Sequence, residues 1–187
     1  MSNTNTIFGW VLASGIVALG GEAPRLTLDA SWRDVAVPVG GGRVLSSPEG
    51  SLALDGRPAG YQARGEVRLA GVAPAGTWRF RGEGDTGHFR LESLETDTLG
   101  GSLAASGRVA WSPALTWAFN ASGTGLDPSS VLPGWPGALD FRAASEGALA
   151  AEGPSGTLNV ERLEGRLRGR TVNASAELEF RGLDRWS

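Results

Sequence analysis

The chain of 187 residues has no cysteine, no lysine and a single histidine. Without cysteine, the protein has no disulfide, thiolate zinc site, iron–sulfur cluster or covalently attached c-type haem. A net charge of −3 and a pI near 5.2, with no cluster of positive charge, argue against a nucleic-acid partner. All 17 basic residues are arginines, and most alternate with acidic residues, which is typical of a solvated sheet face.

Few residues could carry chemistry. The segment 82–87, GEGDTG, spells G-x-G-x-x-G, but an alternating, strand-like segment follows it instead of the helix that a dinucleotide site needs. His88 with Glu83 and Asp85 is a weak set of metal ligands, and a catalytic triad would need the same histidine. We therefore expect a hairpin loop here, and we expect no enzyme, no cofactor and no metal.

From Glu22 onward, the dominant pattern is an alternation of apolar with polar or small residues, which predicts strands with one buried face. Glycine and proline clusters separate these segments and predict turns. The segment Pro128 to Leu132 is the one candidate for a short helical turn, because Asp127 is a suitable N-cap and proline a suitable first residue. The pattern predicts an all-β domain over residues 22–187.

Residues 1–21 differ from the rest of the chain. The run from Ile7 to Gly20, IFGWVLASGIVALG, is apolar and uncharged, and as a helix it would span roughly 21 Å, short of a bilayer core of about 30 Å. We interpret it as a short apolar helix from a truncated membrane anchor or signal-anchor. A buried hydrophobic segment and a foreign, mis-joined leader remain alternatives.

The apolar strand face allows two interpretations. It could be the sealed core of a sandwich or barrel, or it could stay open for an apolar ligand. Small residues among the large ones would leave room for a ligand. Three tryptophans close together in the sequence, Trp111, Trp117 and Trp135, give more aromatic bulk than a small core needs.

Several short motifs carry a resemblance to a known family. They are Leu99-Gly-Gly before a strand, GRVAW at 107–111, GLDP at 125–128 and WPG at 135–137. Together they resemble the repeated region of the TamB family, in the wider AsmA-like group, and the likeness covers residues 22–183. Separately, residues 6–20 are similar to the N-terminal anchor of membrane-bound bacterial c-type cytochromes.

The TamB resemblance implies an elongated, curved and mainly antiparallel sheet that forms an open apolar groove, like a taco shell. It implies a segment of a periplasm-spanning, inner-membrane-anchored protein of the Gram-negative envelope. The associated functions are phospholipid transport toward the outer membrane and, with the outer-membrane barrel TamA, assembly and secretion of outer-membrane proteins. Family members are several times longer, so we expect a fragment that lacks the barrel-contacting C-terminal end.

On this interpretation the partners are phospholipid acyl chains, TamA and a membrane contacted by the N-terminal segment, with no nucleic acid. The arginines Arg108, Arg166 and Arg168, together with Glu177, are predicted to face solvent. Two other functions stay open: a module whose sheet edge binds unfolded outer-membrane strands, and a closed structural domain without ligand. The residues predicted to line the lipid-binding groove are Trp78, Phe80, Leu103, Val109, Trp111, Leu115, Trp117, Phe119, Leu178 and Phe180.

Overall fold

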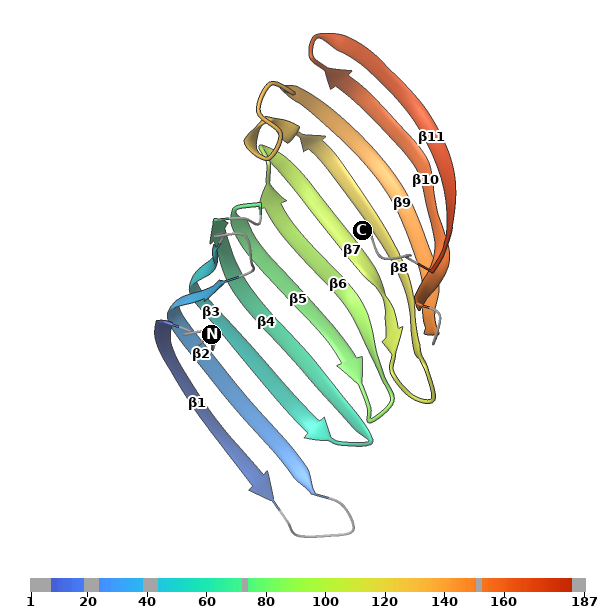
Figure 1. Cartoon of the computed structure of the whole chain (residues 1–187). Helices are drawn as coiled ribbons and strands as arrows, with labels where there is room; N and C mark the ends of the chain where they lie inside the picture. Colours follow the sequence, from blue (N-terminus) through green and yellow to red (C-terminus); the bar gives the residue numbers. More distant parts are fainter. Residues whose placement is uncertain (1–7, 19–23, 39–43, 72–73, 151–152, 183–187) are drawn as a thin grey trace, which may run out of the picture.

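The computed structural model describes residues 8–18, 24–38, 44–71, 74–150 and 153–182. These residues form one sheet of eleven strands, ordered in space as in the sequence, and every neighbouring pair is antiparallel (Figure 1). The predicted all-β, curved antiparallel fold is therefore confirmed. The strands are β1 (Phe8–Ala18), β2 (Arg25–Pro38), β3 (Val44–Arg57), β4 (Gly60–Gly71), β5 (Gly76–Gly84), β6 (His88–Thr98), β7 (Gly101–Ala110), β8 (Leu115–Leu126), β9 (Gly137–Ala150), β10 (Gly153–Leu167) and β11 (Arg170–Arg181).

Short turns join several of the neighbouring strands in the described ranges. Two hairpins turn through two residues with positive φ: Leu99 (53°) and Gly100 (74°) between β6 and β7, and Arg168 (51°) and Gly169 (78°) between β10 and β11. Turns of this kind match the natural twist of the strands that they join. The predicted helical turn is confirmed as a 3-10 helix, η1 (Pro128–Ser130), between β8 and β9.

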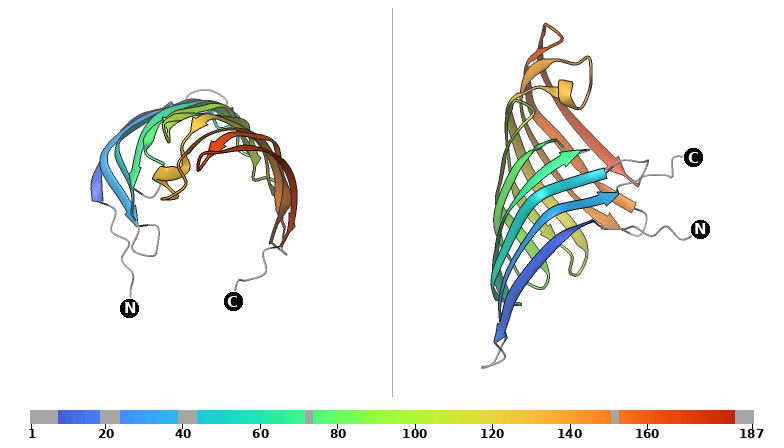
Figure 2. Two further views of the ribbon diagram at one scale, coloured as in Figure 1. Left: turned by 90° about the horizontal axis from the view of Figure 1, so that it is seen from above. Right: turned by 90° about the vertical axis from the view of Figure 1, so that its left-hand side faces the viewer.

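The sheet is bent into an arch, with β1 at one edge and β11 at the other (Figure 2). Register shifts interrupt several ladders, among them β5–β6, β6–β7 and β10–β11. Such bulges add an unpaired residue to one strand and increase its bend and twist. They contribute to the curvature of the arch.

The described residues form a single layer with almost no core. Only Ala63 and Leu126 are buried hydrophobic residues, and no large side chain is fully buried. A sandwich of this length would seal many large side chains between two sheets. The sealed-core interpretation is therefore wrong for the described part of the chain.

The predicted N-terminal helix is also wrong, because Phe8–Ala18 is the edge strand β1. It pairs with β2 along its length, for example Ala13 with Ala30. An isolated short helix is marginal, whereas an existing sheet edge offers backbone partners at every second residue. No helix in the described ranges has the length and apolar character to cross a bilayer. The composition break at Gly21/Glu22 lies outside the described residues, so the division at 21/22 stays a prediction.

Candidate functional site

One face of the sheet, here called the apolar face, carries an unbroken row of apolar residues across all eleven strands. Each member of the row is paired in register with the next. Because alternate residues of a strand share a face, the register places whole sets of side chains here. The row runs Ala13, Ala30, Leu52, Gly65, Phe80, Leu94, Ala105, Ala121, Ala143, Val160 and Ala176.

Aromatic rings on the apolar face lie over glycines of neighbouring strands. At most of these glycines, an added Cβ would come closer than 3.0 Å to ring atoms of the aromatic residue directly opposite. Each ring therefore covers its neighbour's backbone instead of standing away from the sheet. The register pairs are Trp32 with Gly50, Phe80 with Gly65, Tyr61 with Gly84, Phe119 with Gly107, Phe141 with Gly123, Trp117 with Gly147, and Phe180 with Gly156.

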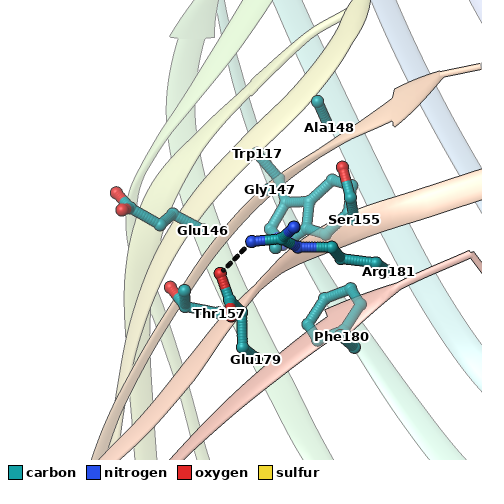
Figure 3. Close-up of a pocket in the computed structure, with 10 residues that line it drawn as sticks. Trp117, Glu146, Gly147, Ala148, Ser155, Thr157, Glu179, Phe180 and Arg181 are labelled. Carbon is teal, nitrogen blue, oxygen red and sulfur yellow. Dashed lines mark hydrogen bonds and ion pairs between the residues drawn. The ribbon is translucent and has the colours of Figure 1, made fainter.

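Glycines also allow two rings from distant strands to meet. Trp117 on β8 and Phe180 on β11 are separated in register by Gly147 and Gly156. Strands lie about 4.8 Å apart, so three strand spacings separate the two backbones, yet the ring centroids are 6.3 Å apart and the planes differ by 9°. Figure 3 shows the two rings beside this glycine gap. The result is a pair of nearly parallel aromatic rings that bridges four strands.

The structure brings nine of the ten predicted site residues onto the apolar face. Trp111 differs, because it follows β7 in the turn toward β8 and its Nε1 donates to the backbone oxygen of Thr86 at 2.8 Å. Several of these side chains remain well exposed, among them Leu115 (38 %), Trp111 (44 %) and Leu178 (54 %). The nine on the face are Trp78, Phe80, Leu103, Val109, Leu115, Trp117, Phe119, Leu178 and Phe180.

The opposite face is polar and carries ion pairs between neighbouring strands, such as Arg79 with Glu66 at 2.6 Å and Arg25 with Asp55 at 2.8 Å. Arg108 and Glu177 lie on this face and are exposed, as predicted. Surface pairs of this kind stabilise a fold only slightly. The charged side chains of this face keep the sheet solvated.

The segment 82–87 forms the β5–β6 hairpin, and β6 follows it directly. The hairpin-loop prediction is therefore confirmed. The Asp85 carboxylate accepts hydrogen bonds from the backbone nitrogens of Gly87 (2.7 Å) and His88 (2.9 Å). The Gly87 bond is the main cause of a lowered pKa for Asp85. The imidazole Nδ1 of His88 lies 2.9 Å from the same carboxylate oxygen, so these two groups serve the turn.

Sequence reasoning did not assign a function to the corner between β8 and β9, although its residues carried part of the family resemblance. The structure gives it three exposed apolar side chains, Val131 (47 %), Leu132 (56 %) and Trp135 (44 %). The guanidinium of Arg168 stacks on Trp135, with its Cζ 5.2 Å from the ring centroid. The signal in the sequence was a proline-rich turn that kept large apolar residues.

The fold and this face define a class of protein: an open, single-layer β-sheet whose described part leaves a continuous apolar face uncovered. A family model described as the TamB N-terminal domain matches residues 12–187, and the chain belongs to the TamB family. Membership indicates a protein of the Gram-negative cell envelope. The match begins within β1. The comparison with solved structures found no match.

Proposed function

We propose that this chain is a segment of an envelope protein that holds phospholipid acyl chains on its apolar face while they move toward the outer membrane. The observation that carries the proposal is the apolar row across all eleven strands, which nothing in the described chain covers. Uncovered apolar surfaces of this extent mark interaction sites in soluble proteins. The segment acts by binding alone and is not an enzyme.

The curvature of the sheet supports a groove. On a curved sheet, side chains of the concave face crowd together, and those of the convex face spread apart. Apart from glycines, the buried residues in the described ranges all lie on the apolar face; they are Ser47, Ala63, Thr96, Thr98 and Leu126. This distribution favours an apolar face that lines the inside of the arch in Figure 2.

Energetics explain why an apolar lining suffices. A sixteen-carbon acyl chain gains about 0.8 kcal/mol per methylene on leaving water, or about 12 kcal/mol in all. That cost opposes movement of a lipid through an aqueous compartment. Contact with aromatic and aliphatic side chains along a continuous row removes much of it at every position. The lipid can therefore slide without any covalent step or bound cofactor.

Three finer parts of the proposal rest on family membership. They are a periplasmic location, attachment to the inner membrane and a role with the barrel TamA in outer-membrane protein assembly. We include them in the proposal because an open groove needs a donor membrane at one end and an acceptor at the other.

Two neighbouring residues of β7 provide a matched test. Leu103 lies on the apolar face opposite Thr96 and Gly123, whereas the exposed Ala104 points to the polar face opposite Glu95 and Ser122. The variants Leu103→Arg and Ala104→Arg introduce the same charge one residue apart. With a phospholipid that carries a photoreactive group in its acyl chain, we expect Leu103→Arg to abolish most crosslinking and Ala104→Arg to retain it. Equal losses in both variants would contradict the assignment of the face.

A second candidate function rests on β1. This edge strand exposes Trp10 (84 %), Leu12 (74 %) and Ile16 (72 %), and its outer backbone groups have no strand partner among the described residues. An edge of this kind accepts an extended peptide through backbone hydrogen bonds. The backbone N–H groups of successive strand residues point to opposite sides, so either Leu12 or Ala13 has its N–H on the open edge. Proline at that residue removes the outward N–H and should abolish binding of an unfolded outer-membrane strand. Leu103→Arg should leave this binding intact.

A further inference from the structure

We infer that the corner between β8 and β9 and the β10–β11 hairpin together form a binding site for the phosphate headgroup of a phospholipid. The inference rests on the proposed function and adds the orientation of the lipid: the headgroup lies at this end of the strands and the acyl chains run along the apolar face. The supporting observation is that two arginine side chains lie beside exposed apolar side chains at this site.

The corner is a rigid structure. The Asp127 carboxylate accepts hydrogen bonds from the backbone nitrogens of Ser129 and Gly137, both at 3.0 Å. The corner is also tied to the turns on both sides, since Asp127 N donates to Leu99 O (2.6 Å) and Arg168 N donates to Pro136 O (2.8 Å). The backbone that carries its apolar side chains is therefore fixed before any ligand arrives, which lowers the entropic cost of binding.

The position of the corner suits contact with a lipid. Both views of Figure 2 place η1 and its loop on the concave side of the sheet, close to the ends of β8 and β9. This loop carries the exposed side chains of Val131, Leu132 and Trp135 between the ends of the two strands. A loop that holds three large apolar side chains in water is unfavourable unless a ligand covers them.

Arg170 supplies the first cation. It is the partner of Leu167 in the β10–β11 ladder, and Leu167 is also the partner of Gly137 at the start of β9. The alternation through Val172 and Phe180 puts Arg170 on the apolar face. Of the charged residues paired in the described strands, Arg170 is the one that the register places on this face, and it is the first residue of β11. A cation in that position marks where the apolar lining ends.

Arg168 supplies the second cation, two residues away in the hairpin turn. Its guanidinium is stacked on Trp135, a contact that orients the group and leaves its N–H edge available. Within the described ranges, neither arginine forms an ion pair with a carboxylate. The nearby acidic groups have other partners: Asp127 accepts from the corner backbone, Glu164 pairs with Arg162 at 2.7 Å, and Asp140 accepts from Gly125 N at 2.7 Å.

Two unpaired guanidiniums beside exposed aliphatic and indole groups match one ligand chemistry. A phosphate is bound well by arginine, and the acyl chains joined to it need an apolar surface that begins next to it. Inorganic phosphate would meet only the charged half of this arrangement. We therefore assign the site to an anionic phospholipid headgroup, and not to free phosphate.

The test uses the chain with phosphatidylglycerol vesicles that carry either a headgroup photoprobe or an acyl-chain photoprobe, and peptide mapping locates the labels. We expect the headgroup probe to label 131–136 and 168–170, and the acyl probe to label the apolar face. An arginine near an anionic lipid surface contributes about a five-fold change in binding. The double variant Arg168→Gln, Arg170→Gln should therefore reduce headgroup labelling of the corner by about 25-fold.

Two controls make the result specific. The double variant Arg108→Gln, Arg142→Gln removes the same charge from exposed arginines of the polar face and should leave labelling unchanged. Lysine at 168 and 170 should restore most of the headgroup labelling, which shows that charge and not folding is responsible. An excess of inorganic phosphate should compete weakly.

The outcomes separate this inference from the proposed function. Acyl labelling of the apolar face with headgroup labelling elsewhere would overturn the headgroup site and leave the groove intact. Absence of acyl labelling in the unmodified chain would refute the groove. If the headgroup probe still labelled the corner in that case, the corner would be a phosphate site alone, and the inference would also be overturned. Unchanged labelling in the Arg168, Arg170 variant would overturn it as well.

Discussion

Substitution of Gly50 by alanine tests whether the aromatic rings lie flat because their partners are glycines. An added Cβ at Gly50 would come within 3.0 Å of three atoms of the Trp32 indole, and its three nearest neighbours all belong to this one side chain. The indole cannot move away freely, because its Nε1 donates to the Oγ of Ser47 at 2.8 Å, and Ser47 is only 8 % exposed.

The expected magnitude follows from these contacts. Insertion of a methyl group into a filled space costs about 1–3 kcal/mol, and release of the indole to relieve the clash gives up a hydrogen bond worth about 1 kcal/mol. Against this, alanine reduces the freedom of the unfolded chain by about 0.4–1 kcal/mol relative to glycine. We therefore expect Gly50→Ala to lower the free energy of unfolding by about 1–2 kcal/mol.

Urea denaturation followed by far-ultraviolet circular dichroism measures this change. The matched control is Gly60→Ala, since a Cβ at Gly60 meets nothing within 4 Å, and it should be neutral or slightly stabilising. In a Trp32→Leu background, the cost of Gly50→Ala should largely disappear. Equal effects at Gly50 and Gly60, or a full cost without the indole, would refute the reasoning.

Three further predictions concern single residues. Hydrogen bonds from the backbone nitrogens of Ser129 and then Gly137 hold the pKa of Asp127 below its ordinary value of 3.8. The carboxylate therefore stabilises the corner above pH 3.8, and this stabilisation is lost as the pH falls through the lower pKa of the folded protein. Trp135 fluorescence should report the loss, and Asp127→Asn should remove this acid transition. The buried Nε1 of Trp78 has no partner among the described residues, so Trp78→Phe should cost less in urea denaturation than Trp32→Phe by about 1 kcal/mol, and a larger loss at Trp78 would contradict this. Val109→Arg should block acyl-chain crosslinking while Arg108→Ala does not, and similar behaviour of the two would argue against a functional difference between the faces.

Local patterns predicted the strands because alternation is a local property of a sheet with two different faces. The sequence from Leu103 to Val109 predicted its own face correctly, and GEGDTG was recognised as a hairpin because a strand-like segment followed it. The helix predicted for residues 7–20 was wrong for a related reason. Its apolar residues lack alternation, and composition alone does not distinguish a short helix from a strand that pairs with an existing edge.

The sequence by itself determined that this protein is all-β, that its strands have one apolar face, and that it resembles the TamB family. Only the tertiary structure decided that this face is left uncovered and that Trp117 and Phe180 meet across two glycines. It also decided that Arg168 and Arg170 lie beside the corner between β8 and β9. The physical reason is that alternation fixes which side chains share a face, whereas register, bulges and sheet curvature fix what that face meets. These depend on pairing between segments distant in the sequence, so they appear only when the eleven strands are placed together.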